Sequence, residues 1–219
     1  MEKKDLIEYS PVQYFEKVSP ALKDGEMGLV TAKKGLGKTS VLVQFGLDSL
    51  IKDKATVHVS FDQHSSNVIS WYSSVLAEIT KKKNISNLSE ISEDIVRNRT
   101  ILNFNQETFT LPKVVNTIKA LNEGGSKIST LVLDGLNLAN TSKEDLSLFA
   151  DFIKKEKMTA WFSYASEADK LKDTLDAEKI NLFTTVAHMA SNGKEIAISL
   201  LKNGEGQVKV DTKTSLMSK

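Results

Sequence analysis

The residues with the clearest chemical potential form a short basic turn, Gly35-Leu36-Gly37-Lys38-Thr39. A loop that wraps around a phosphate turns successive backbone N–H groups inward, and glycines let the backbone approach that closely. The helix that follows adds its unpaired first-turn N–H groups and the positive end of its dipole. The Lys38 ammonium could then reach the β- and γ-phosphates of a nucleotide, and the Thr39 hydroxyl could ligate Mg²⁺. The predicted nucleotide-binding residues are Lys34, Gly35, Leu36, Gly37, Lys38, Thr39 and Ser40, with Lys38 also catalytic.

The residues around this turn decide whether the match is accidental. The full phosphate-loop pattern has glycine at both ends, whereas this chain has Ala32 at the first place, which predicts a strained turn. The alternative is a chance Gly-Leu-Gly-Lys-Thr sequence in a surface turn. A buried strand is predicted over 27–32 and an apolar helix over 41–51, which is the context that a phosphate loop requires. We therefore favour the phosphate site.

Two acidic residues follow predicted strands and could complete the site. Asp134 ends the apolar run Leu131-Val132-Leu133 and could hold Mg²⁺ across from Thr39, as a metal ligand. Asp62 follows a strand predicted over 56–61 and could orient or deprotonate the attacking water, as a catalytic residue. The structural alternatives are an Asp134 that caps the following segment and an Asp62 at the N-terminus of a helix.

Strand-like and helix-like segments alternate through most of the chain, which predicts an α/β fold with a largely parallel sheet covered on both faces. The tail reads as strands only, over 182–189, 195–201 and 207–211, so we expect antiparallel hairpins at one edge. Ligands bind at the carboxyl ends of strands in such sheets. Ala32, Asp62 and Asp134 all lie at such ends, so we expect them to converge on one crevice.

Length and composition indicate one ordinary globular domain. The 219 residues are 40% hydrophobic and carry a net charge of +1, so the composition gives no sign of a nucleic-acid-binding polycation. We predict one domain over 1–219, with an N-terminal extension at 1–19 and a surface excursion at 84–100. The chain has no cysteine, which excludes disulfides and thiol catalysis, and its three histidines are scattered. No signal peptide or membrane-spanning run is recognised, so a cytoplasmic location without membrane contact is expected.

Together these residues resemble the RecA-like P-loop ATPases, most closely the KaiC-type ATPases and the ATPase domain of bacterial replicative helicases. The resemblance covers roughly 20–211. Residues 25–30 resemble the approach to the phosphate loop, 59–63 the strand that ends in a catalytic glutamate, and 133–138 the Walker B stretch. Residues 198–206 resemble the hairpin that carries a basic finger into a neighbouring subunit's site. The resemblance implies ATP, Mg²⁺ and a possible homo-oligomer, as a ring or a lower-order assembly.

The chain departs from that family at three places. Asp62 stands where the family has Glu, and Tyr164 falls about where the helicases keep a phosphate-sensing Gln. Gly204 falls where they carry an arginine finger, which leaves Lys202 as the possible finger, acting within the chain or in trans. Because an arginine finger contributes about 10³–10⁵ in rate, its loss predicts weak hydrolysis. There is no obvious basic DNA loop after 133–138, so nucleic-acid binding is doubtful.

These observations predict a Mg²⁺-dependent ATP-binding protein with weak or regulated ATPase activity. The alternative is a nucleotide-dependent scaffold or regulatory protein with little hydrolysis, because ground-state binding does not require transition-state contacts. A regulatory module without any nucleotide affinity is a third possibility. A minor alternative is a ParA/MinD-like ATPase, since Lys33 stands at that group's signature-lysine position, although Lys34 replaces a glycine. The sequence does not identify the protein partner, and ATP over GTP follows only from the resemblance.

Overall fold

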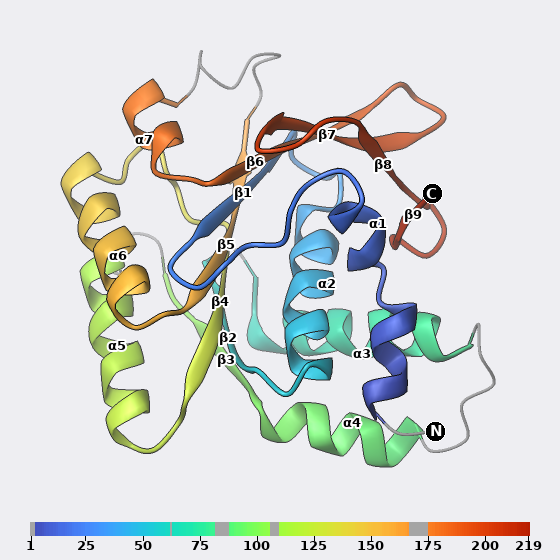
Figure 1. The fold of residues 1–219 in the computed structure, drawn as a ribbon, viewed down its shortest axis with the longest axis horizontal. Coiled ribbons are helices and arrows are strands. Elements are labelled where there is room, and N and C mark those ends of the chain that lie inside the picture. The colour runs from blue at the N-terminus through green and yellow to red at the C-terminus, as the bar shows by residue number, and fades with distance from the viewer. Residues whose placement is uncertain (1–2, 62, 82–87, 106–109, 167–174) are drawn as a thin grey trace.

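The computed structural model describes residues 3–61, 63–81, 88–105, 110–166 and 175–219 of the chain (Figure 1). The helices are η1 (Lys3–Tyr9, a 3-10 helix), α1 (Val12–Glu16), α2 (Lys38–Ile51), α3 (Ser65–Lys81), α4 (Leu88–Arg97), α5 (Leu111–Glu123), α6 (Lys143–Lys155) and α7 (Ala177–Asn181). The strands are β1 (Met27–Ala32), β2 (Ala55–Ser60), β3 (Arg99–Asn103), β4 (Ile128–Asp134), β5 (Thr159–Ala165), β6 (Thr185–Ser191), β7 (Ile196–Lys202), β8 (Gln207–Val210) and β9 (Met217–Ser218).

One nine-stranded sheet runs through the molecule in the order β3-β2-β4-β5-β1-β6-β7-β8-β9. The first six strands in this order are parallel to their neighbours, and β7, β8 and β9 add on antiparallel. The predicted α/β fold with a mostly parallel sheet and C-terminal antiparallel strands is therefore confirmed. The turn at Asn192-Gly193 joins β6 to β7, as the sequence predicted.

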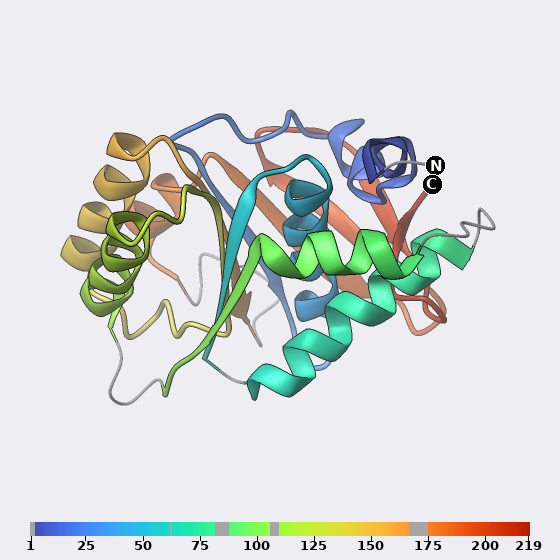
Figure 2. The ribbon, with the colours of Figure 1, turned by 90° about the horizontal axis from the view of Figure 1, so that it is seen from below.

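Helices cover both faces of the parallel part of the sheet. α5, α6 and α7 lie on one face, and α2 lies on the other with α1, η1, α3 and α4 outside it (Figures 1 and 2). α2 is buried on nearly all sides, which is typical of a helix held between a sheet and an outer helical layer. Because both faces are covered, the central strands are almost continuously apolar rather than alternating.

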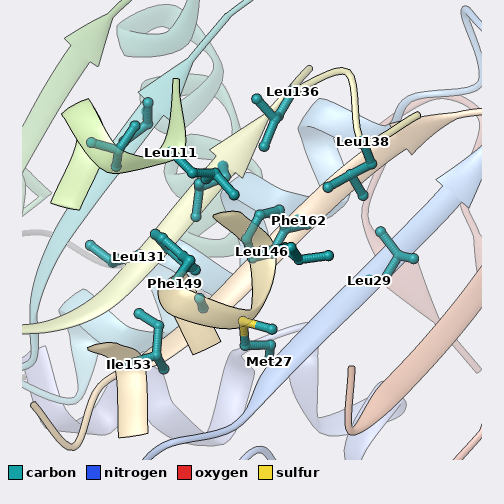
Figure 3. Packing of buried hydrophobic residues seen from close by; sticks show 14 of the residues in the cluster. Met27, Leu29, Leu111, Leu131, Leu136, Leu138, Leu146, Phe149, Ile153 and Phe162 are labelled. Atoms are coloured by element: carbon teal, nitrogen blue, oxygen red, sulfur yellow. The ribbon is translucent and has the colours of Figure 1, made fainter. Parts of the chain in front are cut away.

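The core on the α5–α6 face is built from alternate residues of the strands. Leu29, Leu131 and Phe162 point from three neighbouring strands toward Leu146 and Phe149 of α6 (Figure 3). The Phe149 and Phe162 rings meet edge to face, with their centroids 5.5 Å apart. Aromatic rings prefer this arrangement because the positive edge of one faces the negative face of the other. This packing holds β4, β5 and β1 in the register that positions their carboxyl ends.

The predicted N-terminal extension packs against the body of the protein. Leu6 of η1 and Phe15 of α1 are buried, and the Phe15 ring lies edge-on to Phe45 and Trp161 with centroid separations of 5.1 and 5.6 Å. Phe45 and Trp161 stack on each other with centroids 3.9 Å apart. Within the predicted surface excursion, α4 buries isoleucines against α2 and α3. Both segments therefore contribute apolar surface to the core.

The parallel register brings the carboxyl ends of the central strands to one edge, which we call the loop edge. Ala32 pairs with Ala165 across β1 and β5, and Ser60 pairs with Asp134 across β2 and β4. The antiparallel turn at residues 203–206, between β7 and β8, lies at the opposite edge. No helix among the described residues is both long and apolar enough to cross a membrane.

Candidate functional site

The predicted phosphate turn connects β1 directly to α2. Gly35 and Gly37 have φ angles of 87° and 90°, a left-handed conformation that glycine adopts without strain. A Cβ atom added at either glycine would meet no heavy atom within 4 Å, so open space adjoins the turn. Gly37 is the N-cap of α2 and has no side chain that could satisfy the first-turn N–H groups. The backbone here is suited to an anion.

Ala32 does not strain this turn, contrary to the expectation from the sequence. It is the last residue of β1 and is fully buried. The non-glycine residues with positive φ in the described chain are Asp53, Lys157, Asn203 and Ser215, so Ala32 is not among them. The two glycines that need the left-handed conformation come later in the turn, so alanine at this place costs no backbone strain.

The Lys38 side chain folds back across the turn. Its ammonium donates hydrogen bonds to the carbonyl oxygens of Ala32 and Lys33, at 3.2 Å in each case. Lys34 and Gly35 are exposed and Leu36 is half-buried. The positive charge therefore lies at the start of the turn, at the same edge as the N-terminus of α2.

Thr39 of α2 and Asp134 of β4 are in direct contact although β1, which leads into α2, is not a neighbour of β4. β5 lies between β1 and β4, but α2 crosses over β5 and β4 and carries Thr39 with it. The Thr39 hydroxyl donates to Asp134 Oδ2 at 2.7 Å. The predicted pair of metal ligands is therefore brought together, and a hydroxyl with a carboxylate offers the hard oxygen donors that Mg²⁺ prefers.

A residue that sequence reasoning missed, Ser163 of β5, holds the other oxygen of Asp134. The Ser163 hydroxyl donates to Asp134 Oδ1 at 2.6 Å and accepts a hydrogen bond from the Gly135 backbone N–H at 2.9 Å. Asp134 is only 4% exposed. Burial raises the pKa of this carboxyl, while the hydrogen bonds from Ser163 and Thr39 and the charge of Lys38 act in the opposite direction. A buried carboxylate at this place would be stabilised by a cation.

Gln63 is a second residue to which the sequence assigned no role, although it ends the 59–63 motif. Its side-chain amide donates to the Thr39 hydroxyl oxygen at 2.9 Å. Its backbone N–H donates to Ser60 Oγ at 3.1 Å, and its carbonyl oxygen accepts from Ser60 Oγ at 2.9 Å and from the Asn103 side chain. A serine at a strand end often makes such local turns, which is the only sequence signal for this arrangement. The neighbouring predicted catalytic residue, Asp62, lies outside the described residues.

The Ser40 side chain bonds the C-terminal segment rather than the groups around Thr39. Its hydroxyl donates to the Ser215 carbonyl oxygen at 3.0 Å, and the side chain is fully buried. Gln44, one turn along α2, binds the same carbonyl at 2.9 Å and accepts from the Met217 N–H at 2.8 Å. The Ser40 side chain therefore fastens the C-terminal segment to α2, and only its backbone N–H remains at the predicted nucleotide site.

Lys202, the possible finger, lies far from the turn of its own chain. It pairs with Val186, which pairs in turn with Leu29, three residues before the end of β1. At about 3.3 Å per residue this places it roughly 10 Å back along the strand. Its ammonium donates to the carbonyl oxygens of Phe183 and Asn181 at 2.6 and 3.2 Å. In this structure Lys202 therefore lies away from the turn of its own chain, and a role as a finger stays a prediction.

Gly204 and Tyr164, two of the departures from the RecA-like pattern, both lie in closely packed surroundings. A Cβ atom at Gly204 would lie 2.3 Å from the Val18 carbonyl oxygen, so no side chain fits there without movement of the backbone. The Glu205 N–H donates to that same carbonyl at 3.0 Å. Tyr164 is 7% exposed and belongs to the apolar core on the α5–α6 face. Neither position presents a cation or amide to the turn at 33–37.

The turn therefore has open space beside its two positive-φ glycines, and Thr39 and Asp134 present adjacent oxygen atoms at the same edge. A scan against protein-family models finds no match for the chain, and a search of the curated proteins finds none either.

Proposed function

We propose that this chain is a Mg²⁺-dependent ATP-binding protein with weak or regulated ATPase activity, of the RecA-like P-loop class. The observation that carries the proposal is the 2.7 Å contact between Thr39 Oγ1 and Asp134 Oδ2. A threonine that follows a glycine–lysine pair meets the acid at the end of another strand, and the positive-φ glycines lie in the turn just before it. A chance surface turn has no reason to bring these groups together.

Each group has a distinct part in the proposed binding. The backbone N–H groups from Gly35 to Ser40 would surround the phosphates, aided by the N-terminus of α2. The Lys38 ammonium would leave its two carbonyl partners for the more strongly charged phosphate oxygens. Thr39 and Asp134 would hold Mg²⁺, which supplies charge neutralisation on the phosphate oxygens when bound. ATP is proposed over GTP only from the family resemblance.

The second candidate function is a nucleotide-dependent scaffold or regulatory protein with little hydrolysis. The position of Lys202 favours it, because this ammonium is held by carbonyl oxygens of its own chain at the edge opposite the turn. Gly204 leaves no room for a side chain at the second finger position. Binding of ground-state ATP needs neither residue, whereas acceleration of phosphoryl transfer needs extra charge in the transition state.

The test measures equilibrium binding of a fluorescent ATP analogue to the full chain, with Mg²⁺ and with EDTA. We expect binding by the wild type and a loss of at least about tenfold in Lys38→Ala, because hydrogen bonds to charged groups contribute about 1.5–3 kcal/mol each. Lys194→Ala is the matched control, since Lys194 is exposed in the β6–β7 turn. No binding by the wild type, or equal binding by both lysine variants, would overturn the proposal.

Phosphate release under saturating Mg²⁺ and ATP then separates the two candidate functions. Slow release that is further reduced in Asp62→Asn supports the ATPase. Tight binding with no release above the protein-free rate supports the scaffold or regulatory protein. The measurement is repeated over a range of protein concentrations, because a site completed by a neighbouring subunit turns over faster as the chain assembles.

A further inference from the structure

We propose that Gln63 sets how strongly this site holds a divalent cation, by competing with the cation for the Thr39 hydroxyl oxygen. The inference rests on the proposed function. It starts from one contact, the hydrogen bond of 2.9 Å that the Gln63 side-chain amide donates to Thr39 Oγ1. Gln63 is the last residue of the 59–63 motif, but the motif assigned a role only to Asp62.

The hydrogen-bonding capacity of the Thr39 hydroxyl makes the competition specific. A hydroxyl has one hydrogen to donate and two lone pairs that accept. The hydrogen is used on Asp134 Oδ2 at 2.7 Å, and the Gln63 amide uses one lone pair. A cation bound to Thr39 would take the remaining lone pair of the same oxygen, where its charge would lie beside the positively polarised N–H of the amide. The amide and the cation therefore oppose each other at this atom.

The amide is directed at Thr39 by contacts of its own backbone. Gln63 is half-buried, and its N–H and carbonyl groups bond Ser60 Oγ of β2, at 3.1 and 2.9 Å. The Asn103 side chain of β3 donates to the same carbonyl oxygen. Two strands thus anchor the residue that reaches toward α2. These bonds fix the backbone of Gln63 where its side-chain amide reaches Thr39.

Substitution of Gln63 separates competition from simple support of the site. Gln63→Ala removes the competing donor, so the Mg²⁺ concentration for half-saturation should fall about two- to tenfold, the range that a neutral hydrogen bond of about 0.5–1.5 kcal/mol allows. Gln63→Glu replaces the donor with a second carboxylate near Asp134. This variant should lower the half-saturating Mg²⁺ further, because hard cations prefer additional carboxylate oxygens. With EDTA, Gln63→Glu should bind the nucleotide more weakly than the wild type, because the carboxylate repels phosphate.

The experiment titrates free Mg²⁺ against the full chain at a fixed concentration of the fluorescent ATP analogue. Gln207→Ala is the matched control, since Gln207 lies on β8 and its amide bonds Ser199 at 3.0 Å. Thermal unfolding of each variant checks that it is folded, and Gln63→Asn replaces Gln63→Ala if the latter is not. The half-saturating Mg²⁺ concentration should be highest for the wild type, lower for Gln63→Ala and lowest for Gln63→Glu. The control should have the same value as the wild type.

The outcomes distinguish this inference from the proposed function. If the wild type binds the analogue with Mg²⁺ but Gln63→Ala needs the same or more Mg²⁺, the competition is wrong and the proposed function stands. If the wild type binds no analogue under either condition, both fail. A supporting role alone would weaken Mg²⁺ binding in Gln63→Ala and Gln63→Glu alike, the reverse of the order that competition predicts.

Discussion

The two edges of the parallel sheet each hold a lysine that the sequence associates with phosphate chemistry, and the surroundings of the two differ. Lys38 at the loop edge donates to the carbonyl oxygens of Ala32, at the end of β1, and of Lys33, in the turn that precedes α2. Lys202 at the opposite edge donates to two carbonyl oxygens at the end of α7. The first lies beside the positive end of a helix, and the second lies at a negative end. A similar pair of contacts therefore has opposite electrostatic meaning at the two edges.

The side chains and backbone groups around the two lysines also differ between the edges. At the loop edge the buried Asp134 carboxylate accepts from the Thr39 and Ser163 hydroxyls, the Gln63 amide donates to Thr39, and open space adjoins the glycines of the turn. At the opposite edge the turn of 203–206 packs onto Val18 and Ser19, and Ser19 Oγ donates to the Asn203 carbonyl at 2.8 Å. The comparison teaches that a cation at motif spacing indicates chemistry only where its neighbours leave room for a ligand.

Replacement of one glycine at each edge by alanine should give the largest effects. The replacement at the opposite edge should reduce stability, and the replacement at the loop edge should reduce nucleotide affinity. Gly204→Ala places a Cβ against the Val18 carbonyl, so the free energy of unfolding should fall by about 1–3 kcal/mol, typical of overpacking. Its nucleotide affinity should stay within about twofold of the wild-type value, because Gly204 lies at the edge opposite the turn. A twofold change is small beside the tenfold change that about 1.4 kcal/mol of binding free energy produces. Urea unfolding and binding of the fluorescent analogue measure the two quantities.

Gly37→Ala should reduce nucleotide affinity more than Gly204→Ala does. Its φ of 90° makes alanine strained by about 1–2 kcal/mol, but no heavy atom obstructs the new methyl group within 4 Å. The moved backbone should reduce nucleotide affinity at least about tenfold, since one hydrogen bond to a charged group contributes about 1.5–3 kcal/mol. Equal losses of affinity in Gly37→Ala and Gly204→Ala would break the contrast between the edges.

His58, in the middle of the sheet, tests whether a buried polar group by itself signals function. It is fully buried, its Nδ1 lies 3.2 Å from the Tyr72 hydroxyl, and its Nε2 has no hydrogen-bond partner among the residues that the structure describes. Burial, with the charge of Arg99, lowers the pKa of His58 to about 3. An unfolded histidine has a pKa of about 6.5, so the unfolded chain binds the extra proton as the pH falls below that value.

The stability that neutral His58 contributes is therefore present above pH 6.5 and is lost as the pH falls toward 3. Between pH 7 and 5 the wild type should lose about 2 kcal/mol of unfolding free energy through this group, at about 1.36 kcal/mol per pH unit. His58→Gln should lack this slope, whatever its stability at pH 7. The exposed His64 gives the matched control, His64→Gln, which should keep the slope. Urea unfolding at pH 7 and pH 5 measures the change in unfolding free energy for the wild type and both variants.

Lys202→Ala should have the smallest effect on binding. Loss of its two hydrogen bonds to the end of α7 should lower the unfolding free energy by about 0.5–1.5 kcal/mol. Affinity for the fluorescent analogue should change by less than about twofold. This is well below the tenfold change that about 1.4 kcal/mol of binding free energy produces. ATP turnover that falls in Lys202→Ala only at high protein concentration would show instead that Lys202 acts in a neighbouring subunit's site.

Much of the fold and part of the site were predictable from local patterns. Alternating apolar segments gave the α/β class, and Asn192-Gly193 gave the β6–β7 hairpin. The pairing of Thr39 with Asp134 was also predicted, because an acid at a strand end and a helix N-terminus share one edge of a parallel sheet. The expected strain at Ala32 was wrong, since the left-handed positions fall on Gly35 and Gly37.

The amino-acid order by itself determined the local backbone: which residues form strands and helices, and which glycines permit the turn before α2. These depend on periodicity and φ preference, which act over a few residues. Only the tertiary structure decided that Gln63 and Ser163 join the site, that Ser40 turns to the C-terminal segment, and that Lys202 lies at the far edge. Contacts between segments far apart in the chain depend on strand order and on the direction in which α2 crosses the sheet, and no local pattern encodes either.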